Sequence, residues 1–135
     1  MSAGYSGTPL GKKLGLKPDM VAVCLNAPDD YGARLGDDFR QPPSVEGLQG
    51  GEDFIHLFTT LRAELDDVAR QAFATMNRDG MLWVSWPKKA SKVPTEITED
   101  VIREICLPIG LVDVKVCAVS EIWSGLKLVI RKELR

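Results

Sequence analysis

Three lysines follow a short apolar run, and their position suits the binding of an anion. The run spans residues 81–86 and ends in a proline, after which come Lys88, Lys89 and Lys92. In an open α/β sheet, ligands bind in the loops that follow the carboxyl ends of the strands. Free N–H groups at the start of the next helix would add to the attraction for negative charge. The sequence therefore predicts an anion-binding loop, with a solvated basic loop as the alternative.

Further side chains near this loop are candidates for contact with a ligand. Trp86 and Trp123 each border a loop, where an indole ring either lines a pocket or packs in the core. Asn26 follows the first apolar run and would face the same edge as Lys88, where it binds a ligand or, more simply, caps the next turn. Ser124 precedes a glycine, and we expect this pair to form a tight hairpin turn, the alternative being close backbone approach to a ligand. The candidate ligand-binding residues are Asn26, Ser85, Trp86, Lys88, Lys89, Trp123 and Ser124.

The residues that usually carry catalysis are missing from the pattern. The single histidine, His56, lies inside an apolar run, and no serine, cysteine or acidic partner is placed by the sequence to activate it, so we predict a core histidine. The chain has neither the phosphate-binding Gly-x-x-x-x-Gly-Lys loop nor the Gly-x-Ser-x-Gly elbow. Cys24, Cys106 and Cys117 are far apart and flanked by apolar residues, so we expect them to be buried and reduced. No catalytic residue and no metal site is predicted.

The elements that must position these residues alternate between strand and helix. Short apolar runs predict strands, and apolar residues at helical spacing predict helices. The predicted strands are 20–25, 53–58, 81–86, 111–119 and 126–132. The predicted helices are 9–14, a turn ending at 35, 61–76, and one that starts at Thr95 or Thr98 and ends by 110. The order predicts an α/β three-layer sandwich whose sheet is mostly parallel and closes with a C-terminal antiparallel hairpin, because the last two strands are too close for a crossover.

Length, composition and charge set the broad class. The 135 residues suit a single domain, with a lead-in over 1–19, an α/β core over 20–132 and an irregular stretch over 36–52. A net charge of −2 excludes a generally basic surface, so we expect no nucleic acid bound by bulk charge. No apolar stretch reaches the roughly 20 residues needed to span a bilayer. The first residues lack the features of a signal peptide, so a cytoplasmic location is expected.

The order of elements resembles the second half of a class I, S-adenosylmethionine-dependent methyltransferase. Residues 53–58 look like the fourth strand of that family and residues 79–84 like the fifth, and the family also ends in an antiparallel strand pair. The resemblance implies a minimal Rossmann-like fold. Two departures concern the cofactor. Where the family has a glycine-rich loop, this chain reads Asn26-Ala27-Pro28-Asp29-Asp30, and residues 26–52 are too few for the two αβ units that the family has there.

Several short motifs also resemble those of a family of small bacterial proteins, defined as a domain of unknown function. The shared motifs are Leu14-Gly15-Leu16-Lys17-Pro18, Trp83 to Lys88, Gly110-Leu111 and Trp123-Ser124-Gly125-Leu126. This resemblance implies a fold and no activity.

These observations together favour a binding or regulatory domain without catalytic activity. It would have a methyltransferase-like fold without the glycine loop and would bind an anionic small molecule or a protein partner at the edge that carries Asn26, Ser85, Trp86 and Lys88. No cofactor is expected. Two alternatives stay open: a divergent methyltransferase that holds S-adenosylmethionine without those glycines, and an interaction module that forms a homodimer through the last strand or a helix face.

Overall fold

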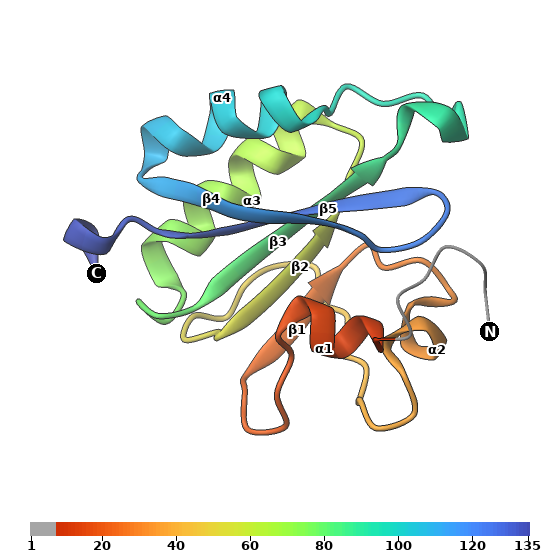
Figure 1. Cartoon of the computed structure of the whole chain (residues 1–135). Coiled ribbons are helices and arrows are strands. Elements are labelled where there is room, and N and C mark those ends of the chain that lie inside the picture. Colours follow the sequence, from red (N-terminus) through yellow and green to blue (C-terminus); the bar gives the residue numbers. More distant parts are fainter. Residues whose placement is uncertain (1–7) are drawn as a thin grey trace.

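In the computed structural model, which describes residues 8–135, three buried strands form the parallel half of one sheet (Figure 1). They are β1 (Ala22–Leu25), β2 (Phe54–Phe58) and β3 (Met81–Pro87), paired in that order. Their side chains are buried almost throughout. Apolar residues follow one another without alternation because helices cover both faces of these strands.

The other half of the sheet is antiparallel, as the short connection predicts. It consists of β4 (Leu111–Ala118) and β5 (Trp123–Ile130), and β5 lies between β3 and β4. The prediction that Ser124 and Gly125 form the hairpin turn is wrong, because both residues lie within β5. The turn precedes them, and the N–H groups of Val119 and Ser120 both donate to the carbonyl of Trp123. A side chain at position 125 would lie 3.1 Å from Val119 Cγ2, so close packing inside the sheet explains this glycine.

Helices cover the sheet on both sides, which makes three layers (Figure 1). On one face lie α3 (Arg62–Thr75) and α4 (Glu99–Ile109), which pack over the larger apolar cluster. On the other face lie the short helices α1 (Leu10–Leu14) and α2 (Tyr31–Leu35), over a second apolar cluster. Within residues 8–135, no helix has both the length and the apolar character needed to cross a membrane.

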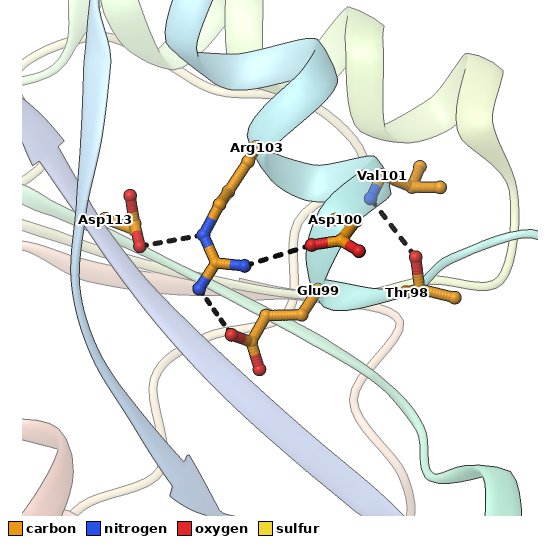
Figure 2. Close-up of polar contacts among 6 residues, drawn as sticks. All are labelled: Thr98, Glu99, Asp100, Val101, Arg103 and Asp113. Atoms are coloured by element: carbon orange, nitrogen blue, oxygen red, sulfur yellow. Dashed lines mark hydrogen bonds and ion pairs between the residues drawn. The ribbon is translucent and has the colours of Figure 1, made fainter.

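The start of α4 has the predicted cap (Figure 2). The Thr98 hydroxyl accepts a hydrogen bond from the Val101 N–H at 3.1 Å. One turn further along, Arg103 contacts Glu99 on its own helix and Asp113 on β4, the latter at 3.0 Å. Because Arg103 bonds to both elements, it ties α4 to the strand at the edge of the sheet.

The segment between α2 and β2 forms no strand of its own. Its one pairing with the sheet is an isolated bridge between Cys24 and Ser44. In that bridge, the Cys24 N–H donates to the Pro43 carbonyl and the Val45 N–H donates to the Cys24 carbonyl, both at 2.9 Å. These bonds cover the outer edge of β1, which would otherwise present unpaired backbone groups.

The same segment is fixed to α1 through a close ring contact. A Cβ atom built on Gly11 would lie 2.4 Å from two ring atoms of Phe39. The Phe39 ring therefore rests directly on the helix backbone, and only glycine allows this approach.

We predict that Gly11→Ala destabilises the protein by about 1–3 kcal/mol, because the added methyl group displaces the Phe39 ring. Alanine's higher helix propensity would act in the opposite direction, so the sign of the change is informative. The measurement is the free energy of unfolding in urea. Gly47→Ala is the matched control, since its added methyl group meets nothing within 4 Å. If Gly11→Ala proved as stable as the wild type, the contact with Phe39 would be incorrect.

Candidate functional site

The loops after β1, β2 and β3 meet at one edge of the sheet, as predicted for a ligand site. Asn26 directly follows β1 and has a φ of 60°, a left-handed conformation that asparagine tolerates better than most residues. Its side-chain amide donates to the Phe58 carbonyl at 3.1 Å and to Glu64 Oε2 at 3.0 Å. Asn26 thus fixes the turn after β1 to the end of β2.

Glu64, in the first turn of α3, completes this set of bonds. Its Oε1 accepts a hydrogen bond from the Thr59 hydroxyl at 2.6 Å, and that hydroxyl oxygen accepts from the Leu61 N–H at 3.1 Å. A carboxylate at this position also complements the positive end of the helix dipole. The edge between β1 and β2 is therefore closed by hydrogen bonds within the protein, which fits the simpler expectation that Asn26 stabilises a turn.

The other predicted residues gather where β3 ends and β5 begins. In the antiparallel register, Ser85 lies opposite Gly125, Trp86 opposite Ser124, and Pro87 opposite Trp123. Successive side chains on a strand point to opposite faces. Trp86 packs in the apolar cluster under α3 and α4, whereas Trp123 packs in the cluster under α1 and α2. The fold brings these residues together in the sheet but divides them between its two faces.

Ser85 belongs to a buried polar chain that the sequence did not reveal. Its hydroxyl lies 2.7 Å from His56 Nε2, and the Tyr31 hydroxyl lies 2.8 Å from His56 Nδ1. His56 is a core residue, as predicted, but it has two partners. The parallel register of β2 and β3 explains the contact between His56 and Ser85. His56 pairs with Trp83, so Ser85, two residues after Trp83, points to the same face of the sheet as His56.

Burial decides what this chain of groups can do chemically. Burial lowers the pKa of His56 to about 3 and raises the pKa of Tyr31 above its usual value, so both stay neutral at ordinary pH. Ser85 is fully buried and cannot meet a substrate. The Phe58 ring stacks on His56 with centroids 4.2 Å apart, and Trp123 packs edge-on against Phe58 at 5.2 Å. The arrangement links α2, β2 and β3, and Trp123 helps to cover it.

The lysine loop, which follows β3, is largely exposed. A short 3-10 helix, η1 (Lys89–Ser91), lies within it, and the Ser91 hydroxyl donates to the Lys88 carbonyl at 2.7 Å. Lys89 and Lys92 are exposed and Lys88 is half-buried. Among residues 8–135, none of the three forms an ion pair, so their charges are available to an anion.

The cysteines do not form a site of their own. Cys24 and Cys106 are buried, as expected, whereas Cys117 is partly exposed. Burial raises the pKa of the Cys106 thiol to about 12, which keeps it protonated and unreactive. Across the described part of the chain, no three histidine, cysteine, aspartate or glutamate side chains gather in a way that could hold a metal ion.

Known proteins resemble this chain in structure alone. No family model and no curated protein matches its sequence. A fibrillarin pre-rRNA processing protein from Methanococcus jannaschii is 11% identical over 91% of this chain and 69% of its own, with a TM-score of 0.57. Magnesium protoporphyrin IX methyltransferase from Synechocystis PCC 6803 was solved with bound S-adenosylmethionine. It is 12% identical over 89% of this chain and 74% of its own, with a TM-score of 0.58. An S-adenosylmethionine-dependent methyltransferase from Clostridium acetobutylicum is 8% identical over 80% of this chain and 74% of its own, with a TM-score of 0.53.

These similarities confirm the fold predicted from the order of elements. The chain has the α/β, Rossmann-like architecture of class I methyltransferases, with a five-stranded mixed sheet. The resemblance to a small bacterial family, which rests on short motifs, stays a prediction. Because one fold hosts many activities, function has to be argued from the residues at the site.

The neutral state of His56 predicts a pH dependence of stability. The unfolded chain takes up a proton on this histidine below its ordinary pKa of 6.5, whereas the folded protein does so only near 3. The unfolded state then binds more protons, so stability falls as the pH drops from 6.5 towards 3. Between about pH 7.5 and 5.5, this group should lower the free energy of unfolding by about 1.4 kcal/mol.

His56→Phe removes the titrating group. The variant should be less stable, but its free energy of unfolding should fall by about 1.4 kcal/mol less than that of the wild type over the same pH interval. Urea unfolding at the two pH values measures the difference. An equal fall in both proteins would mean that His56 is not kept neutral by burial.

Proposed function

We propose that the protein is a divergent member of the class I methyltransferase fold that binds S-adenosylmethionine at the carboxyl edge of β1 and β2. The main support is the similarity in fold to S-adenosylmethionine-dependent methyltransferases, one of which was solved with that molecule bound. This favours the divergent methyltransferase over the domain without a cofactor that we expected from the sequence.

The methionine end of the cofactor suits the residues at this edge. The left-handed φ of Asn26 supplies the sharp turn after β1 for which the family uses glycine. The carboxylates of Glu64 and Asp29 lie on or beside that turn, and Asp29 is exposed. Carboxylates attract the ammonium and sulfonium groups of S-adenosylmethionine, which carries a net positive charge.

The adenosine end does not fit the described residues. In the related enzymes two further αβ units would lie between β1 and β2, whereas here residues 36–53 make only the bridge at Cys24 and Ser44. No strand is present there to carry groups for the ribose. Binding through the methionine end is therefore what we propose, and no step of methyl transfer follows from these side chains.

Calorimetric titration with S-adenosylmethionine and S-adenosylhomocysteine tests this proposal. We expect a dissociation constant below about 100 μM for S-adenosylmethionine, a free energy of about −5.5 kcal/mol. S-adenosylhomocysteine, which lacks the sulfonium charge, should bind more weakly. Glu64→Gln should weaken binding of S-adenosylmethionine several-fold, and Glu133→Gln, at an exposed site after β5, should not. The absence of binding up to about 1 mM would overturn the proposal.

A second candidate is the domain without catalytic activity that binds an anion at the lysine loop. The observation in its favour is that Lys88, Lys89 and Lys92 form no ion pair with other described residues, while the neighbouring edge is closed.

Titration with inorganic pyrophosphate tests the lysine loop. If the loop is an anion site, Lys88→Ala combined with Lys89→Ala should reduce pyrophosphate affinity at least about tenfold. Lys12→Ala with Lys132→Ala, which removes two exposed charges elsewhere, should leave it unchanged. Binding equal to that of the wild type in the first variant would count against this candidate. A dimer in light scattering, unaffected by either variant, would favour the homodimeric interaction module.

A further inference from the structure

A pocket of about 790 Å³ lies at the amino end of β1, away from the edge discussed above. It opens between the loop that leads from α1 into β1 and the segment that follows α2, the two loops that extend below α1 in Figure 1. Its volume is within the range typical of small-molecule sites. None of the residues predicted from the sequence as ligand-binding lines it. It is lined by residues 16–18 and 20–22 on one side and by residues 38–43 on the other.

The first wall of the pocket is held by hydrogen bonds at both of its ends. The Leu16 N–H donates to the Gly11 carbonyl at 2.9 Å, which closes the end of α1. At the other end, the Val21 N–H donates to Asp53 Oδ2, also at 2.9 Å. The loop between these points is therefore fixed in place without a ligand.

The opposite wall is equally well held. Phe39 rests on the backbone of α1 at Gly11, and Gln41 packs closely against Gly32 in α2. The carbonyls of Pro42 and Pro43 accept hydrogen bonds from the Cys24 thiol and N–H, at 3.2 and 2.9 Å. Because both walls are ordered by contacts within the protein, a ligand would find the pocket already formed and would lose little free energy in ordering it.

The lining combines apolar surface with an excess of positive charge. Val21, which immediately precedes β1, has an apolar side chain that is 56% exposed. Two cations, Lys17 and Arg40, line the pocket together with a single carboxylate, Asp38. In the described part of the chain, neither cation forms an ion pair. The residues that line the pocket therefore carry one net positive charge beside apolar side chains.

We propose that this pocket binds a small amphipathic organic anion, an apolar ring or chain that carries one acidic group. The apolar part would contact Val21, Met20 and Phe39, and the acidic group would lie between Lys17 and Arg40. The planar guanidinium of arginine suits a carboxylate, sulfonate or phosphate, since it donates two parallel hydrogen bonds. The site lies at the opposite end of β1 from Asn26, so it is independent of the function proposed above.

A pair of fluorescent probes that differ only in charge tests the proposal. The anion 8-anilinonaphthalene-1-sulfonate should bind the folded protein saturably at one site, and N-phenyl-1-naphthylamine has the same rings without the sulfonate. Lys17→Gln combined with Arg40→Gln should lower affinity for the sulfonate at least about tenfold and change affinity for the uncharged probe less than about twofold. Val21→Ser, which removes apolar contact and no charge, should lower the affinity for both probes to the same extent.

Lys115→Gln with Lys132→Gln serves as the control, because it removes two exposed positive charges, one on β4 and one after β5, that lie across the sheet from β1. It should leave both affinities unchanged. Near-ultraviolet circular dichroism and the urea midpoint confirm that each variant is folded. The proposal is overturned if the sulfonate does not bind saturably, if the Lys17 and Arg40 variant binds it as the wild type does, or if the control loses as much affinity.

Discussion

The buried imidazole of His56 is the constraint on which the arrangement of this sheet depends. A polar group in a core is costly unless it is hydrogen-bonded, and both ring nitrogens have a hydroxyl partner here. Helix α2 must therefore place Tyr31 against His56, and Ser85 must lie on the face of the sheet to which His56 points. Ser85 in turn limits what fits opposite it, and a side chain at Gly125 would come within 3.3 Å of its hydroxyl. The observed register fits this constraint, since it places Gly125 opposite Ser85 and Trp123 against Phe58, the ring that stacks on His56.

The carboxyl edge of β1 and β2 is shaped by a second set of polar bonds. Asn26, Thr59 and Glu64 bond to one another and to the backbone around them, so the turn after β1 is stable without a ligand. A glycine-rich loop would expose N–H groups to the cofactor, whereas this loop uses a side-chain amide to join two strands. If S-adenosylmethionine binds, Glu64 has to exchange one of these bonds for the cofactor's ammonium group.

Local patterns in the sequence predicted the elements well, and contacts between distant elements escaped them. The apolar runs located β1, β2 and β3, and the Thr98 hydroxyl marked the start of α4, because these features depend on neighbouring residues. Ser124 and Gly125 were assigned to a turn because glycine is common in turns, but the demand for glycine comes from the side chains of Val119, Ser85 and Trp83 that pack against it. The partners of His56 and the pocket beside β1 depend on register and on an irregular segment, which have no periodicity to read.

The irregular segment between α2 and β2 affects both ends of β1. The methyltransferase fold that the chain resembles has two αβ units in this interval, and this chain has only a single bridge there. The shortened segment still has to cover the open edge of β1, and it does so through Pro43 and Cys24. In crossing that edge it places Phe39 and Arg40 opposite the loop after α1, and the space between them is the pocket. The same short connection that weakens the case for S-adenosylmethionine therefore also forms the pocket at the other end of the strand.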